Sequence, residues 1–197
     1  MSFDFPAPAE DIAVLSRRER KKRDQKYAII RAAQILIEEK GYDETSINEI
    51  AEAADISYAT FFNYFPTKDD MLLAISHVEY EDLLEIVNLR HNNEEASTDI
   101  LRDIFMEWNA DSFRYCNVSM RLQEVSMRCA TQPELGEVVE LLAILVARGV
   151  AQGEYRADTN PEVIAILLSG LRNELFRSKR SDLAEPAFNQ VIDSIKI

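Results

Sequence analysis

The sequence predicts an all-α protein, and three observations support this fold class. The 197 residues include only five glycines and six prolines, too few for the many tight turns of a β-sandwich or barrel. No segment alternates polar and apolar residues for long enough to indicate a strand, whereas the three-and-four spacing of helices recurs along most of the chain. With 47% hydrophobic residues, the chain can bury a core in one or two compact domains.

Nine helices are expected. The first runs from about Arg20 to Lys40 and stops at Gly41, the residue type that best closes a helix. The second begins near Ile47, because Ser46 and Glu49 fit the S/T-x-x-E capping box. In that motif the hydroxyl and the carboxylate each accept a hydrogen bond from a free backbone N–H group.

A third, short helix is expected from Tyr58 to about Asn63 or Tyr64, with Ser57 as its cap and Asp55 in the turn before it. Two helices joined by so short a turn must cross steeply. Small alanines on the second helix allow the third to approach closely, which is the geometry by which a helix-turn-helix offers its second helix to the major groove of DNA.

Six more helices follow in the prediction. Thr67 and Asp70 cap a connecting helix whose apolar stripe reaches from Met71 toward Val87. The polar stretch from Arg90 to Thr98 is expected to be a loop. The remaining helices are expected at about residues 100–115, 118–129, 133–153, 161–177 and 184–197.

The net charge of −13 is unevenly distributed. Between residues 16 and 31, Glu19 and Asp24 oppose eight cationic side chains: Arg17, Arg18, Arg20, Lys21, Lys22, Arg23, Lys26 and Arg31. Because phosphate neutralisation is local, this basic segment can hold DNA while the acidic remainder limits non-specific association.

Residues from about Lys26 to Leu72 carry a further pattern. It consists of Gly41-Tyr42, Thr45-Ser46, Ile50-Ala51, Ile56-Ser57, Ala59-Thr60-Phe61-Phe62, Tyr64-Phe65-Pro66-Thr67-Lys68 and Met71-Leu72. The order and spacing of these residues resemble the DNA-binding domain of the TetR family of transcriptional regulators. Beyond Leu72, only the chain length and the all-helical pattern agree with that family. Two positions depart from it: Asp55 stands where the family usually has glycine, and Phe62 where tyrosine is common.

The resemblance implies a three-helix N-terminal DNA-binding domain and a C-terminal helical domain for ligand binding and dimerisation. We therefore expect a flexible extension at residues 1–16, the helix-turn-helix domain at 17–70, and the effector-binding and dimerisation domain at 71–197. The expected function is that of a repressor released from its operator by a small molecule. Activation of transcription, and a less favoured all-helical protein-binding adaptor, remain alternatives.

DNA contacts are expected at and before the third helix. By resemblance, Thr45, Ser46, Thr60, Tyr64 and Lys68 match positions that typically touch phosphates, and Tyr64 could supply the hydroxyl that Phe62 lacks. Tyr58, Ala59, Thr60 and Asn63 lie on the exposed side of the helix, where Asn63 could pair with adenine and a methyl group could contact thymine. The cap Ser57 completes the expected DNA-binding set. Phe61 and Phe65 are expected in the core.

The resemblance also implies an effector and a second copy of the chain. Aromatic and methionine residues of the middle helices suit an effector pocket, although for any single one ordinary core packing or a solvated face is favoured over ligand contact. They are Phe105, Trp108, Asn109, Phe113, Met120 and Met127. A homodimer that reads a palindromic operator is expected to pair through the last two helices, where Gly170 suggests a close crossing within or between chains.

Other functions find little support in the sequence. It lacks a glycine-rich phosphate loop, H-E-x-x-H and G-x-S-x-G, and His77 and His91 have no obvious catalytic partner, so no enzyme activity, metal or cofactor is expected. Cys116 and Cys129 suggest neither a metal cluster nor a disulfide framework. No apolar run approaches the roughly 20 residues that span a bilayer, so a cytoplasmic protein without membrane contact is expected.

Overall fold

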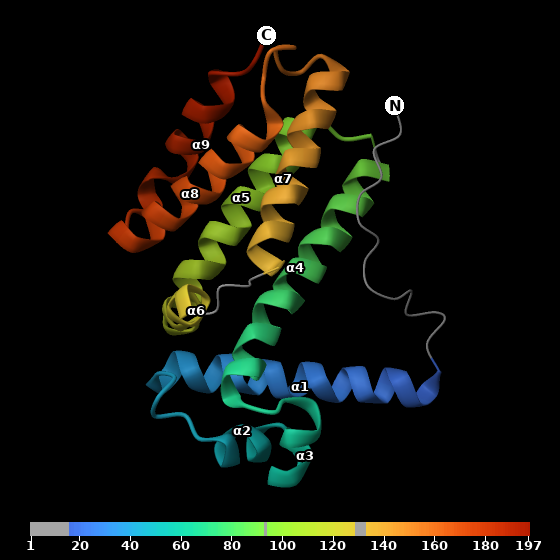
Figure 1. The fold of residues 1–197 in the computed structure, drawn as a ribbon, viewed down its shortest axis with the longest axis vertical. Coiled ribbons are helices and arrows are strands. Elements are labelled where there is room, and N and C mark those ends of the chain that lie inside the picture. Colours follow the sequence, from blue (N-terminus) through green and yellow to red (C-terminus); the bar gives the residue numbers. More distant parts are fainter. Residues whose placement is uncertain (1–15, 93, 129–132) are drawn as a thin grey trace. The chain divides into compact units, whose positions relative to one another are not determined.

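The computed structural model describes residues 16–92, 94–128 and 133–197, and helices make up most of them (Figure 1). Within these ranges the nine predicted α-helices are present, which confirms the all-α fold. They are α1 (Arg17–Lys40), α2 (Ile47–Ala53), α3 (Tyr58–Tyr64), α4 (Lys68–Asn92), α5 (Ser97–Arg114), α6 (Cys116–Arg128), α7 (Pro133–Gln152), α8 (Pro161–Ser178) and α9 (Ala184–Asp193). The predicted N-terminal extension, apart from Ser16, and Cys129 lie outside the described residues.

The described residues divide into two compact units. The N-terminal unit comprises residues 16–81 and 115–128, and the C-terminal unit comprises residues 82–114 and 133–197. Helix α4 contributes to both units, and α6 belongs to the N-terminal one although it follows α5 in the chain. The functional division expected after residue 70 stays a prediction.

The core of the N-terminal unit forms where the apolar faces of its helices meet. Most of its residues come from α1 and α4, and α3 adds Phe61. Helix α6 contributes Val118 and Val125, which are also buried. The buried set is Ile29, Ile30, Ala33, Ile37, Ile50, Phe61, Phe65, Met71, Leu72, Ile75, Val118 and Val125. The unit is therefore built from helices on both sides of α5 in the sequence.

In the C-terminal unit, α7 packs against both α5 and α8, and α9 packs against α5 and α8. The first turn of α5 is capped from far along the chain by the Glu154 carboxylate. This group accepts hydrogen bonds from the backbone N–H groups of Ser97 (2.8 Å) and Thr98 (3.0 Å) and from the Thr98 hydroxyl (2.9 Å). A carboxylate in this position satisfies free N–H groups and interacts favourably with the helix dipole.

Two predicted boundaries in this unit were wrong. The expected loop from Arg90 to Thr98 is shorter, because α4 continues to Asn92 and the distant Glu154 cap lets α5 begin at Ser97. The last helix ends at Asp193 instead of Ile197, because the chain end pairs with the segment after α7. There the Arg156 backbone N–H donates to the Ile195 carbonyl (2.9 Å). None of the helices in the described ranges is long and apolar enough to span a membrane.

Candidate nucleic-acid interface

Helix α2 begins with the predicted capping box. The Ser46 hydroxyl accepts from the Glu49 backbone N–H (3.2 Å), and the Glu49 carboxylate accepts from the Ser46 backbone N–H (2.9 Å). Lys40, the last residue of α1, also donates to the Glu49 carboxylate. These hydrogen bonds fix the start of α2 relative to the end of α1, so local sequence sets the placement of the helix.

The turn between α2 and α3 runs through Asp55, whose φ of 53° lies in the left-handed region. Glycine adopts this region freely, and aspartate is one of the few other residues that tolerates it. The backbone N–H of Ile56 then donates to the Ala51 carbonyl (2.9 Å), which closes the end of α2. The turn expected from the sequence is therefore formed without glycine.

Helix α3 has one buried face and one exposed face. Its start is capped by Ser57, whose hydroxyl accepts from the Thr60 backbone N–H (3.1 Å). Phe61 is fully buried in the core of the N-terminal unit, and Phe65 just after the helix is also buried, as predicted. Tyr58 is 52% exposed, and Ala59 and Asn63 are exposed with it.

Phe62 also lies on the exposed side of α3, at 39% exposure. Its ring meets those of Tyr58 and Phe61 edge to face, with centroid separations of 5.1 and 5.5 Å. The sequence left open whether Phe62 lies in the core or on the surface. The structure shows a partly exposed ring that supports Tyr58 from the side.

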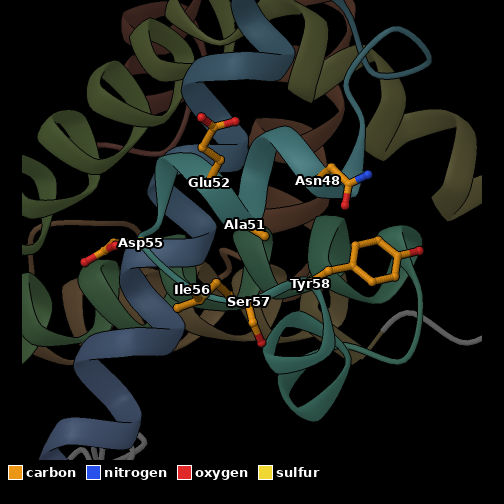
Figure 2. A pocket seen from close by; sticks show the side chains of 7 residues that line it. All are labelled: Asn48, Ala51, Glu52, Asp55, Ile56, Ser57 and Tyr58. Atoms are coloured by element: carbon orange, nitrogen blue, oxygen red, sulfur yellow. The ribbon is translucent and has the colours of Figure 1, made fainter.

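An open hollow of about 490 Å³ lies on the surface between α2 and α3 (Figure 2). Asp55 lies at the turn on one side of the hollow, whereas Asn48 and Tyr58 project on the other. Its lining consists of Asn48, Ala51, Glu52, Asp55, Ile56, Ser57 and Tyr58. The carboxylates of Glu52 and Asp55 disfavour a phosphate in direct contact with them.

The structure corrects one predicted phosphate contact. Thr45 is buried, and its hydroxyl donates to the carbonyl oxygens of Gly41 (2.8 Å) and Leu36 (3.2 Å). Its side chain therefore holds the connection between α1 and α2 together and does not face solvent. The sequence could not distinguish a buried threonine from an exposed one at this position.

Four other hydroxyl groups of the predicted set, those of Ser46, Ser57, Thr60 and Tyr64, have partners within the chain. Ser46 is exposed and bonded to Glu49, whereas Thr60 is half-buried with its hydroxyl 2.7 Å from that of Ser57. The Tyr64 hydroxyl donates to the Gln25 side chain on α1 (2.8 Å). A phosphate contact by Tyr64 would therefore require the hydroxyl to exchange this partner.

Lys68, the first residue of α4, is held by Tyr42. Its ammonium lies 4.0 Å from the centre of the Tyr42 ring and donates to the Tyr42 carbonyl oxygen. Burial lowers the pKa of Lys68 from its ordinary value. The sequence pointed to Lys68 through the family resemblance, but it gave no sign that Tyr42 would be its partner.

The basic segment forms the first turns of α1. A capping box opens the helix, in which Ser16 and Glu19 exchange backbone-to-side-chain hydrogen bonds. The cationic side chains that follow lie at the surface, most of them exposed: Arg17, Arg18, Arg20, Lys21, Lys22, Arg23, Lys26 and Arg31. A positive surface therefore belongs to the same unit as α3.

The predicted effector residues fall into both units. On α5, Phe105 packs on Phe188 of α9, with the ring centres 5.4 Å apart, and Phe113 packs on Phe176 of α8, with the ring centres 5.6 Å apart. The Arg172 guanidinium lies over the Trp108 ring at 4.4 Å.

The remaining members of this set differ in burial. Asn109 is buried, and its side-chain carbonyl oxygen has no hydrogen-bond partner in the part of the chain that the structure describes. Met120 lies exposed on α6 in the N-terminal unit, and the Met127 side chain is outside the described residues. Four of the six residues therefore belong to α5 in the C-terminal unit, and Met120 belongs to the N-terminal unit.

The position of Glu49 yields a prediction for acid stability. Hydrogen bonds from Lys40 and then from Ser46 lower the pKa of Glu49 from 4.5 to about 2. A depressed carboxylate pKa adds stability above pH 4.5, and this contribution is lost as the pH falls from 4.5 toward 2. In urea unfolding at pH 6, 4.5 and 3, the stability advantage of the natural protein over Glu49→Gln should therefore shrink with falling pH. An advantage that stayed constant over this range would contradict the assignment.

Comparison with known proteins supports this site. Residues 29–75 match the family model described as "Bacterial regulatory proteins, tetR family". The HTH-type transcriptional regulator YuxN of Bacillus subtilis is 28% identical over 106 residues, which cover 53% of this chain and 36% of that protein. The HTH-type transcriptional repressor AcnR of Corynebacterium glutamicum is 21% identical over 184 residues, which cover 89% of this chain and 93% of that protein.

A solved structure shows the same fold over most of the chain. It is the transcriptional regulator FadR from Bacillus subtilis in complex with stearoyl-CoA, with a TM-score of 0.66 and 16% identity. The match covers 84% of this chain and 97% of FadR. The capped helix pair lies within the matched residues, so residues 29–75 form a domain of the tetR family of bacterial regulatory proteins, and the chain shares the fold of a solved transcriptional regulator over most of its length.

Proposed function

We propose that the protein is a sequence-specific DNA-binding repressor, released from its operator by a small-molecule effector. The observation that carries the proposal is the exposed face of α3. Tyr58 and Asn63 lie on it, while Phe61 on the opposite face is fully buried and fixes the helix. A short helix held in this way can enter the major groove without reorganising the unit.

Base and phosphate contacts divide between α3 and its surroundings. Asn63 can pair with adenine in the major groove, and the methyl groups of Ala59 and Thr60 can contact thymine. The helix caps Ser46 and Ser57 and the charge of Lys68 fix the register by binding phosphates. The basic turns of α1 add sequence-independent affinity that falls with salt. The acidic remainder does not prevent binding, because phosphate neutralisation is local.

A homodimer follows from the size of the site and from an unpartnered face of α8. One seven-residue helix reads only a few base pairs, so a palindromic operator and a two-fold dimer are expected. Val163, Ile166 and Leu167 on α8 are exposed although they are apolar. A Cβ atom at Gly170 would meet nothing within 4 Å, so the described residues do not make the close helix crossing that this glycine suggests. A second copy of α8 fits this surface.

The C-terminal unit is proposed to bind the effector near the aromatic residues of α5. The related fold of FadR is solved with stearoyl-CoA, which shows that this architecture accommodates a small-molecule ligand in that protein. Trp108, Asn109 and Phe113 all lie on α5, where the i, i+4 spacing of Asn109 and Phe113 places them on one face of the helix. An effector would release the operator only if it bound the DNA-free state more tightly than the DNA-bound state.

Duplex binding tests the proposal directly. We expect the protein to bind fluorescent duplexes taken from beside its own gene, with affinity that falls steeply as salt rises. Lys68→Ala should weaken binding to every duplex alike and reduce the slope of log affinity against log salt by about 1. Lys196→Ala removes the same charge from the C-terminal unit and should leave both quantities unchanged. Failure of the natural protein to bind any such duplex would favour the adaptor alternative.

A further inference from the structure

Tyr42 lies where three elements of the N-terminal unit meet. It follows α1, and its ring contacts Lys68 at the start of α4 and Arg121 on α6. The Lys68 ammonium lies 4.0 Å from the ring centre, and the Arg121 guanidinium carbon lies 4.4 Å from it. Both distances are well within the range of cation–π attraction. One aromatic ring thus makes cation–π contacts with side chains from two different helices.

Hydrogen bonds fix this cluster on several sides. Lys68 donates to the Tyr42 carbonyl, and the Tyr42 hydroxyl donates to the Asp69 carboxylate. Arg121 donates to Glu124 one turn further along α6 (2.9 Å), and its side chain is mostly buried. Burial, followed by the hydrogen bond to Asp69, raises the pKa of Tyr42 above its ordinary value, so the ring stays neutral. Tyr42 can therefore hold both cations at physiological pH.

Helix α6 is itself firmly attached to α1. The Asn117 backbone N–H donates to the Glu38 carboxylate (2.9 Å), and the Asn117 side-chain amide donates to the Glu38 carbonyl (2.9 Å). Val118 and Val125 of the same helix are buried in the core of the unit. The helix that carries Arg121 is thus anchored to α1 and to the core of the unit.

The two cations also repel each other across the ring. Beyond the effect of burial, the charge of Arg121 contributes to lowering the pKa of Lys68. The charge of Arg121 therefore affects how strongly Lys68 holds its proton. Both side chains contact the Tyr42 ring, and no hydrogen bond joins them directly among the described residues.

We propose that Arg121 and Tyr42 are positioning residues for Lys68, which they hold at the phosphate-facing start of α4. The inference rests on the proposed function, because it matters only if Lys68 contacts DNA. Arg121 acts on DNA through Lys68 and not by a phosphate contact of its own. Helix α6 is thereby part of the DNA-binding apparatus, although it lies far from α3 in the sequence.

The test is a double-mutant cycle on duplex affinity. Arg121→Met keeps an unbranched apolar stem but removes the guanidinium and its charge. It should weaken binding about two- to fivefold, the factor that corresponds to one partly exposed cation–π contact. It should also lower the salt slope by up to about 1. In a Lys68→Ala background, Arg121→Met should change neither quantity. Arg121→Lys keeps a cation over the ring and should restore most of the affinity.

Two controls separate this role from a structural one. Arg114→Met removes an exposed arginine of the C-terminal unit, ion-paired with Asp111 at 2.9 Å, and should leave DNA affinity unchanged. Thermal unfolding of each variant reports any loss of fold. Equal effects of Arg121→Met with and without Lys68 would overturn the proposal, as would no effect at all. If the natural protein bound DNA and Lys68→Ala weakened it, the proposed function would survive that failure, whereas absence of DNA binding would remove both.

Discussion

Phe61→Ala should destabilise the N-terminal unit by about 3–5 kcal/mol, the range for removing a large buried aromatic side chain. Phe61 is fully buried, and its ring packs against that of Phe65 with centroids 5.7 Å apart. Alanine would leave a cavity beneath α3, and the helix would lose the contact that fixes its depth in the core. Urea unfolding followed by circular dichroism measures the change.

The adjacent residue supplies a matched control. Phe62 is the same amino acid on the same helix, but 39% exposed. Phe62→Ala should cost clearly less, about 1 kcal/mol in stability, because 39% of its surface stays in contact with water in the folded protein. Its effect should appear in duplex affinity, through the loss of support for the Tyr58 ring. If the two substitutions destabilised the protein equally, the assignment of the two faces of α3 would be wrong.

Leu167→Glu should convert the proposed dimer to a monomer. Leu167 is apolar and 51% exposed on α8, and a dimer would bury two copies of this surface. Placing a carboxylate there would force either desolvation of the charge or separation of the chains. A monomer would carry one helix-turn-helix domain instead of two. Operator affinity should therefore fall by about 10²–10⁴-fold, the usual gain from linking two binding modules. Analytical ultracentrifugation gives the oligomeric state, and fluorescence anisotropy gives the affinity.

Leu89→Glu is the control for this prediction. Leu89 is also an exposed leucine, at 63% exposure, but lies on α4. It should leave both the oligomeric state and the affinity unchanged. Gly170→Ala provides a second readout, because an alanine in an isolated helix would stabilise the chain by about 1 kcal/mol. A loss of stability instead would indicate that another chain occupies the space next to Gly170. A natural protein that sedimented as a monomer would contradict the proposal at the outset.

Local chemistry made the helix-turn-helix predictable. The capping box of Ser46 and Glu49, the cap Ser57 and the apolar spacing around Phe61 are each set by neighbours within four residues. Such signals can be read from the chain without knowledge of the fold. They were sufficient to predict both helices and the exposed face that carries Tyr58 and Asn63.

Distant contacts were not predictable in the same way. Nothing near Thr45 indicated that its hydroxyl would be buried on the carbonyl of Leu36. The start of α5 depends on Glu154, more than fifty residues later, so the expected loop was too long. Similarly, no local sequence signal indicates that the apolar residues of α6 pack in the N-terminal unit. These features depend on which helices meet, and that information is absent from periodicity alone.

The discontinuous N-terminal unit bears on how the chain folds during translation. When residues 16–81 have left the ribosome, the surface of that unit that receives Val118 and Val125 is still open to water. Synthesis proceeds at about 5–20 residues per second, so α6 follows only seconds later. During that interval the nascent chain presents an uncovered apolar surface, which chaperones recognise. A fragment that ends at residue 81 would keep this surface permanently and should aggregate more readily than the whole protein.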